Sequence, residues 1–368
     1  MGPLAYVLAG RAATGSFAAG GLLAGANAFG QGFAAPLSGR RLDRRETRSA
    51  LAGSVAIAGV MFAVLAVAVS SHASLIVLLP LGFLSGACVA GLPGGYRALL
   101  AAGVDGPLLD VALTVDAALI EVIWITGPPL AGAIIALRSA TVALAVMAAL
   151  AAASTLLTLR LPRRPVVRAS SPSRGVFTRP AVPIYAVGFG MGLAFGGVDF
   201  GFAPLARAVG AGPAGASALL ALLAFSSGVS ALVYGTRNPS ASSSRRVGIG
   251  LAVWAIMLAP LSTIPSLWVG VPFTLVAGLP IAMLNAQISL LLKARVPQER
   301  QAEAFSVVWS AMTIGAGIGS TIGAACESPF GARSVFVVIP ALVLVLGVSI
   351  AMASAPPRAV DIGSHGPT

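Results

Sequence analysis

The sequence predicts an all-α polytopic membrane protein, and three observations support this fold class. The chain of 368 residues is 57% hydrophobic and only 9% charged. An ordinary soluble domain carries about 25% charged residues, which it needs to cover its surface. Apolar runs follow one another along the chain, and the basic residues concentrate in the gaps between alternate runs. We therefore expect lipid to surround most of these segments.

The apolar runs are long enough to be counted as membrane spans. About 18 apolar residues are needed to cross the hydrocarbon core of a bilayer. We predict eleven full spans, at 15–37, 50–70, 74–94, 110–137, 140–160, 181–205, 213–235, 247–264, 267–291, 302–325 and 333–354. The stretch MGPLAYVLAG before them is apolar but too short to cross alone. We interpret it as an N-terminal stub of a twelfth span, whose beginning is absent from the sequence.

The placement of basic residues orients the predicted spans. Alternate gaps and the C-terminal tail hold nineteen basic residues, and the other gaps hold only Arg11, Arg138, Arg207 and Arg333. Cytoplasmic loops of membrane proteins carry an excess of Lys and Arg. We therefore expect the richer gaps and the C-terminus on the cytoplasmic side of the cytoplasmic (inner) membrane.

The longest polar stretch divides the chain into two halves. Residues 160–180 are rich in Arg, Pro and Ser, which is typical of a linker. We expect an N-terminal helical bundle with a truncated first helix at 1–160, a cytoplasmic linker at 161–180, a C-terminal six-helix bundle at 181–355 and a cytoplasmic tail at 356–368. The segment GTRNPSASSSRR (235–246) follows the second span of its half, as SGRRLDRR does in the first half, which indicates an internal repeat.

The segment PLSGRRLDRRETR (36–48) resembles a loop motif of the major facilitator superfamily. Its positions Gly39, Asp43, Arg44 and Arg48 match that motif, and the remaining positions match it only in part. Asp43 can face the N-terminus of a helix of the other half that begins near 298–305, where the helix dipole favours an anion. The resemblance implies that the four matching residues lock the outward-facing state. The alternative is that the arginines only set the topology.

A second segment, DAALIEVIWITGPPLAG (116–132), looks like the Gly-Pro motif of exporters in this family. Gly127, Pro128 and Gly132 match its core, and the residues from 196 to 237 resemble two helices of drug-exporter-like bacterial members. The resemblance implies a major-facilitator-type fold in which two helical bundles enclose a central cavity. It also implies alternating access and favours export.

Three acidic residues lie inside predicted spans and are candidates for proton coupling: Glu121, Asp199 and Asp116. A charged carboxylate at such depth is costly, so it is usually paired or protonated. Asp116 and Glu121 are five residues apart, about 140° round a helix, so at most one faces a cavity directly. The alternative is a structural acid bonded to a polar group on a neighbouring helix. Since the predicted spans offer no Lys or Arg partner, proton coupling stays a hypothesis.

Polar and aromatic residues within the spans are candidates for cavity lining or for ordinary packing. Asn27 and Gln31 are four residues apart on one helix and share a face. The other candidates are Trp124, Asn285, Gln287 and Trp309, together with Phe195, Phe200 and Trp254. Glycines at 315, 317, 319 and 323 are expected to make the eleventh helix slim, so that helices approach closely.

The remaining residue inventory argues against an enzyme. Cys88 and Cys326 lie in apolar segments without metal-ligand spacing, and His72 and His365 lie in a loop and a tail. We find no nucleophile–base set, and we expect no cofactor, no metal and no nucleic-acid partner. The sequence thus predicts a monomeric secondary transporter that exports small apolar or amphipathic molecules, with protons as the coupled ion. Metabolite uptake or facilitative transport, and a transporter-like scaffold without transport, remain alternatives.

Overall fold

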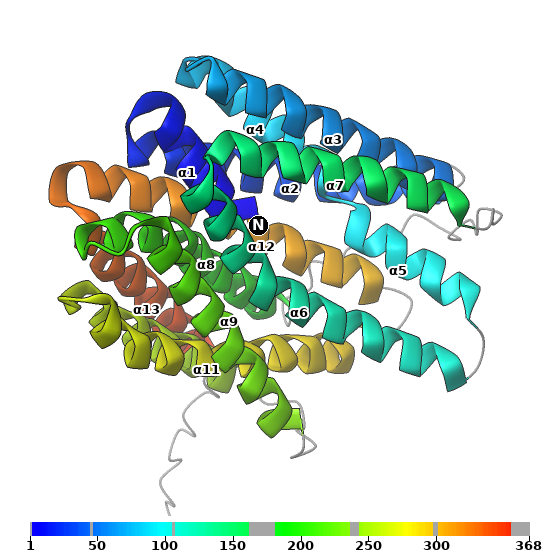
Figure 1. Cartoon of the computed structure of the whole chain (residues 1–368). Helices are drawn as coiled ribbons and strands as arrows, with labels where there is room; N and C mark the ends of the chain where they lie inside the picture. Colours follow the sequence, from blue (N-terminus) through cyan, green and yellow to red (C-terminus); the bar gives the residue numbers. More distant parts are fainter. Residues whose placement is uncertain are drawn as a thin grey trace, which may run out of the picture.

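The computed structural model describes residues 2–44, 47–104, 107–161, 181–235, 243–296 and 301–354, and every regular element in these ranges is helical. The helices lie side by side, and the chain reverses direction at two opposite ends of the bundle (Figure 1). We call one end the linker end, because Arg160 and Ala181 flank the predicted linker there. The opposite end, where α1 turns into α2, is called the far end.

Each half of the chain contributes one set of helices. The N-terminal half contains α1 (Gly2–Thr14), α2 (Phe17–Arg44), α3 (Thr47–Ser70), α4 (Leu75–Val89), α5 (Leu92–Gly103), α6 (Pro107–Leu137) and α7 (Ala140–Arg160). The C-terminal half contains α8 (Val182–Ala208), α9 (Gly212–Gly235), α10 (Ser244–Leu258), α11 (Leu267–Arg295), α12 (Gln301–Phe330) and α13 (Val335–Ala353). Two short 3-10 helices, η1 (Ala259–Thr263) and η3 (Ala332–Ser334), adjoin α10 and α13.

The helices agree with the predicted spans in number and position. Nine helical segments in the described part of the chain are long and apolar enough to cross a membrane, and each coincides with a predicted span. The two other predicted spans, 15–37 and 110–137, correspond to α2 and α6, which have 28 and 31 residues. The stub before the first full span forms α1, with 13 residues.

Two boundaries differ from the prediction. Helix α2 continues to Arg44, so Gly39, Asp43 and Arg44 are helical and do not lie in a loop. Arginine favours helix, and a charged helix end can extend beyond the apolar part of a span. The predicted span 74–94 is divided between α4 and α5, and Arg97 is inside α5 instead of a gap. Gly91 and Pro93 at this break explain why one regular helix does not continue.

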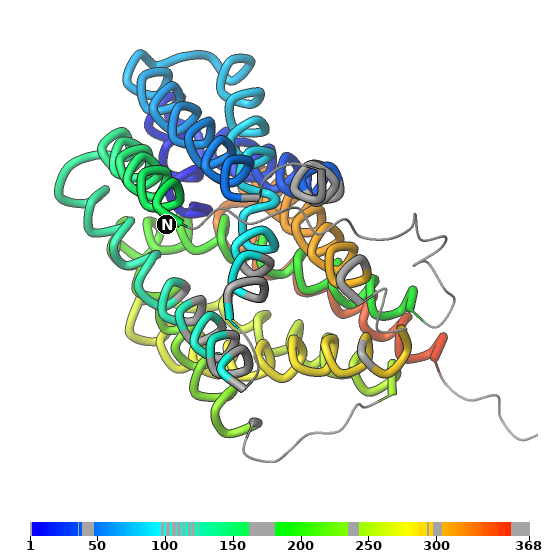
Figure 2. Tube along the Cα trace, turned by 90° about the vertical axis from the view of Figure 1, so that its right-hand side faces the viewer, coloured from blue at the N-terminus to red at the C-terminus, as the bar shows by residue number. Residues whose placement is uncertain are grey.

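The two halves repeat the same pattern of neighbours. In the N-terminal half α2 packs on α4 and α3 packs on α7; in the C-terminal half α9 packs on α11 and α10 packs on α13. Figure 2, seen from the linker end, shows most N-terminal helices in the upper part and most C-terminal helices below them, with α6 beside the lower group and α12 beside α2. This correspondence is what the internal repeat in the sequence predicts.

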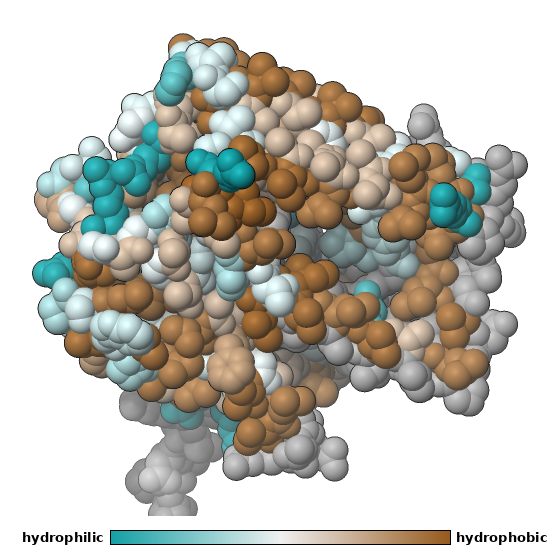
Figure 3. All heavy atoms as spheres, viewed as in Figure 1, coloured by the Kyte–Doolittle hydropathy of each residue, from teal (hydrophilic) through white to brown (hydrophobic). Residues whose placement is uncertain are grey.

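The repeat is incomplete at the first helix of each half. Helix α8 has 27 residues and packs along both α12 and α13, whereas its counterpart α1 has 13 residues. As a result α6 packs most extensively on α9 of the other half. The space-filling view shows a hollow between α7 and α6 (Figure 3).

Candidate functional site

The two halves meet along α2 and α12 through facing glycines. A methyl group at Gly25 would lie 3.0 Å from the carbonyl oxygen of Gly317, and one at Gly317 would lie 3.1 Å from that of Gly25. Nearer the far end, a methyl group at Gly21 would lie 2.6 Å from the Cβ of Ala324. Backbone therefore lies against backbone at this crossing, which small residues make possible.

The predicted glycines of α12 face two different helices, α8 and α2. A side chain at Gly315 or Gly319 would overlap the backbone of α8 within the same half, whereas Gly317 faces α2 of the other half. Gly323 lies against the ring of Phe200. The prediction of a slim helix with close neighbours is confirmed.

The second crossing between the halves uses the Gly-Pro motif of α6. This helix passes through Pro128 and Pro129 without interruption and buries Gly127 and Gly132. A methyl group at Gly132 would overlap the hydroxyl of Ser217 on α9 and would lie 3.1 Å from the carbonyl oxygen of Pro213. The motif thus lies where the two halves nearly touch.

The contact stripe of α12 is buried at the far end and exposed at the linker end. Positions three or four residues apart share a helix face, and Ala324, Gly317 and Ser310 lie on the face towards α2. These three are buried, whereas Ser306, one turn nearer the linker end on the same face, is exposed. The α2-facing side of α12 is therefore covered from the far end to the middle of the helix.

A chain of hydrogen bonds joins α1, α2 and α4 in the N-terminal half. The hydroxyl groups of Tyr6 and Ser85 lie 2.7 Å apart, and Asn27 Nδ2 donates to Ser85 Oγ over 3.1 Å and to the carbonyl oxygen of Gly82 over 3.3 Å. Gln31 Nε2 donates to Asn27 Oδ1 over 2.9 Å. Tyr6, Ser85 and Asn27 are buried, whereas Gln31 is half-buried. Asn27 and Gln31, the predicted pair on α2, thus form one end of this hydrogen-bonded chain, and the Gln31 amide is the more exposed of the two.

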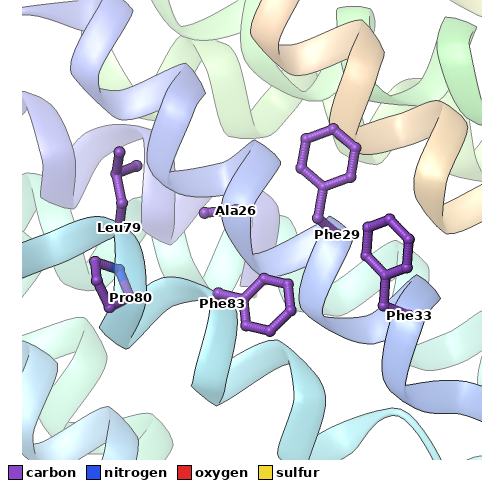
Figure 4. Close-up of a pocket in the computed structure, with 6 residues that line it drawn as sticks. All are labelled: Ala26, Phe29, Phe33, Leu79, Pro80 and Phe83. Carbon is purple, nitrogen blue, oxygen red and sulfur yellow. The ribbon is translucent and has the colours of Figure 1, made fainter.

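An apolar groove of about 470 Å³ lies on a different face of α2. Figure 4 shows its lining, which comes from α2 (Ala26, Phe29, Phe33) and α4 (Leu79, Pro80, Phe83). Gln31 is two residues from both Phe29 and Phe33, and two residues correspond to about 200° round a helix. The groove therefore faces away from the polar chain and does not belong to the same site.

The acidic candidates have different surroundings. Asp199 lies within α8, is half-buried, and makes no hydrogen bond with any residue that the structure describes. Asp116 is half-buried on α6 and already interacts with its surroundings. The side chains of Glu121 and Trp124 lie outside the described residues.

Of the three cavity candidates on α11 and α12, one is buried in a contact and two are exposed. Gln287 on α11 is buried, and its Nε2 donates to the hydroxyl of Tyr234 on α9. Asn285 is exposed on α11, and Trp309 on α12 is 40% exposed. The structure therefore does not bring these residues together with Asn27 and Gln31 in one described cluster.

Two of the aromatic candidates are packing residues. Trp254 is fully buried on α10, donates from Nε1 to the carbonyl oxygen of Ala277 over 2.8 Å, and meets Phe195 edge to face at 5.1 Å. Phe200 is fully buried against Gly21 and Gly323. For Trp254 and Phe200 the structure favours packing over cavity lining.

Arg48 has a local partner in the predicted lock segment. Its Nη1 donates to the carbonyl oxygens of Leu159 and Leu161, each over 3.1 Å, at the C-terminal end of α7. These carbonyl groups have no partner within the helix, and a cation is favoured at this end. The surroundings of Gly39 and the side chains of Asp43 and Arg44 lie outside what the structure describes.

The sequence reasoning missed a cluster at the far end. The Arg11 Cζ lies 4.4 Å from the ring centroid of Phe17, and the Arg207 Cζ lies 5.8 Å from the same centroid. Glu327 on α12 interacts electrostatically with both arginines. A usable signal was present, because Arg11 and Arg207 stand near the ends of the corresponding helices α1 and α8, each shortly before a glycine with positive φ.

Two helical halves related by an internal repeat and joined by close crossings define a membrane transporter fold. The profile of the Major Facilitator Superfamily matches residues 3–237, so the chain belongs to this superfamily of transporters, which are not enzymes. No curated protein sequence matches the chain.

Solved structures agree with this assignment of the fold. A point variant of the nucleoside transporter NupG covers 96% of this chain and 98% of its own, with a TM-score of 0.70 and 15% identity. NupG itself covers 96% of both chains, with a TM-score of 0.66 and 18% identity. The human organic anion transporter MFSD10 (TETRAN) covers 90% of this chain and 83% of its own, with a TM-score of 0.64 and 18% identity. These similarities confirm the two-bundle fold and single out no drug exporter.

Proposed function

We propose that this secondary transporter exports small apolar or amphipathic organic molecules by alternating access, in exchange for protons. The observation that carries the proposal is the one-sided contact between the halves, which covers the α2-facing side of α12 from Ala324 to Ser310 and leaves Ser306 exposed. Such an arrangement is expected of one of the two end states of a rocking transporter.

The excess of arginine at the linker end supports its placement in the cytoplasm of a cell with an inner membrane. The C-terminal tail would then be cytoplasmic, and the described state would be closed to the outside. Release of the proposed lock at Gly39, Asp43, Arg44 and Arg48 fits this state. We retain a monomer as the working unit.

The cargo is expected to have a large apolar part and a hydrogen-bonding group. The polar chain from Tyr6 to Gln31 places a half-buried amide at its end, and an amide can donate to or accept from a neutral polar group. The same network favours a second candidate, facilitated movement of a neutral polar metabolite, and one structural neighbour is a nucleoside transporter. We name Gln31 as the first cargo contact to test, before Trp124, Asn285, Gln287 and Trp309.

Asp199 is the first candidate for the proton carrier. It is the acid that is half-buried within a span and has no hydrogen bond among the described residues. Protonation stabilises a carboxyl group within an apolar span, because the charged form is costly there. In alternating access, the carboxyl group would bind a proton while it is accessible from one side of the membrane and release it on the other side. Glu121 remains the second candidate.

Transport in proteoliposomes with an imposed pH gradient tests this proposal. The panel should contain amphipathic dyes, nucleosides and organic anions, and Asp116→Asn is measured beside Asp199→Asn and Glu121→Gln, because Asp116 is the third candidate for proton coupling. We expect Asp199→Asn to lose accumulation driven by the gradient while it keeps downhill exchange. Unchanged accumulation in Asp199→Asn and in Glu121→Gln would contradict proton coupling through these groups. Uptake of nucleosides without any effect of the gradient would favour the second candidate.

A further inference from the structure

The far end carries a cluster to which both halves contribute. Arg11 comes from α1 and Phe17 from the start of α2, whereas Arg207 comes from α8 and Glu327 from α12. Phe17 is buried, Arg11 and Glu327 are half-buried, and Arg207 is exposed. The cluster therefore joins the N-terminal half to the C-terminal half at the end where their helices are in contact.

The internal repeat explains why two arginines meet here. Arg11 and Arg207 occupy corresponding positions near the far ends of α1 and α8, and these two helices contact each other across the boundary between the halves. Two like charges at such a boundary repel each other, so closure of the far end needs compensation.

Two other residues of the cluster supply this compensation. The Phe17 ring has guanidinium groups from both halves within 4.4 Å and 5.8 Å of its centroid, which is within the range of a cation–π interaction. Glu327 on α12 interacts electrostatically with both arginines, of which Arg11 belongs to the other half. Separation of the halves would take Arg207 away from the ring and Arg11 away from Glu327.

We propose that Arg11, Phe17, Arg207 and Glu327 form a latch that holds the far end closed, and that the far end opens when the latch separates. This inference rests on the proposed alternating-access function. The latch has an internal balance, because Phe17 and Glu327 favour closure whereas the repulsion between the arginines opposes it. Loss of either stabilising residue therefore opens the far end, and subsequent loss of Arg11 in the Glu327 variant closes it again, because Arg207 keeps its contact with the Phe17 ring.

Distances between spin labels test the latch in protein reconstituted into nanodiscs. One label pair at Ser16 and Phe330 reports on the far end, and a second at Leu161 and Ser243 reports on the linker end. All four positions are exposed, and each pair has one member in each half. The native cysteines are replaced by serine in all variants.

We expect Phe17→Leu to raise the population with a long far-end distance about fivefold, which is the effect of one cation–π contact. Glu327→Gln should raise the same population, because the attraction between Glu327 and Arg11 across the boundary is lost. Glu327→Gln combined with Arg11→Gln should return towards the wild-type distribution, because the repulsion is removed while Arg207 keeps its contact with the Phe17 ring. A purely structural role would predict additive damage in this double variant. An unchanged far-end distribution in both single variants, or no rescue in the double variant, would overturn the latch.

Arg333→Gln is the matched control at the same end. Arg333 Nη2 donates to the carbonyl oxygen of Ile264 over 3.2 Å, and both residues belong to the C-terminal half. We expect its far-end distribution to equal that of the wild type. The label pair at the linker end distinguishes the latch from alternating access. In alternating access, the linker-end distance shortens when the far end opens. If the far end opens and the linker-end distance does not change, alternating access is contradicted, whereas the proposed latch still stands.

Discussion

A single methyl group at Gly132 should change the balance between the two end states of this transporter. In the closed far end, the new Cβ would overlap the hydroxyl of Ser217 and would lie 2.5 Å from the Cβ of that residue. The two atoms belong to α6 and α9, so the clash lies between the halves. Gly132→Ala should therefore destabilise the closed far end more than the fold of either half.

The magnitude follows from the cost of overpacking. An extra methyl or methylene group in a well-packed contact costs about 1–3 kcal/mol. A free-energy difference of about 1–3 kcal/mol changes a population ratio about 5- to 150-fold. We therefore expect Gly132→Ala to raise the ratio of open to closed far ends within this range, as read from the label pair at Ser16 and Phe330.

A compensating change makes this prediction specific. Ser217→Gly removes both atoms in conflict and leaves the carbonyl oxygen of Pro213, at 3.1 Å, as the nearest neighbour of the new methyl group. The double variant should return towards the wild-type ratio. Gly53→Ala on α3 is the control, because a methyl group there meets no atom within 4 Å. Equal ratios in wild type and Gly132→Ala, or failure of Ser217→Gly to compensate, would refute the reasoning.

Two further predictions concern Arg48 and Gln31. Arg48→Gln should lower the thermal unfolding midpoint in detergent because two carbonyl oxygens at the end of α7 lose their donor, at a cost of about 1 kcal/mol. Arg138→Gln, an exposed arginine directly after α6, is the matched control, and an equal decrease in both variants would assign the effect to charge alone. Gln31→Leu should weaken the apparent affinity for hydrogen-bonding cargo about tenfold, the effect of one lost hydrogen bond; unchanged affinity in a transport assay would exclude Gln31 as a cargo contact.

The sequence was sufficient for the spans, because hydropathy reports directly on contact with lipid. It was also sufficient for the close crossings, since glycines in apolar helices allow backbones to approach. Gly132 and Gly317 are two glycines of this kind, and both lie at crossings between the halves. The pairing of Asn27 with Gln31 followed from helical periodicity alone.

Other features depend on contacts between segments that are distant in the sequence. Nothing near Phe17 in the chain indicates that Arg207 lies beside its ring, because only the packing of α1 and α2 against α8 brings them together. Trp254 and Phe200 looked like possible cavity residues, because an aromatic residue in a span has the same sequence signal whether it packs or lines a cavity. Clustered charge does not by itself indicate a loop, because a charged helix end can extend beyond the apolar part of a span, as α2 does up to Arg44.

The packing of α6 bears on which helices move relative to one another during the transport cycle. This helix belongs to the N-terminal half by sequence, but its main neighbour is α9. Rocking of the halves therefore moves α6 relative to α9, and the surface that slides includes the crossing at Gly132 and Ser217. The hollow between α6 and α7 lies within one half, so rigid-body rocking leaves its width unchanged.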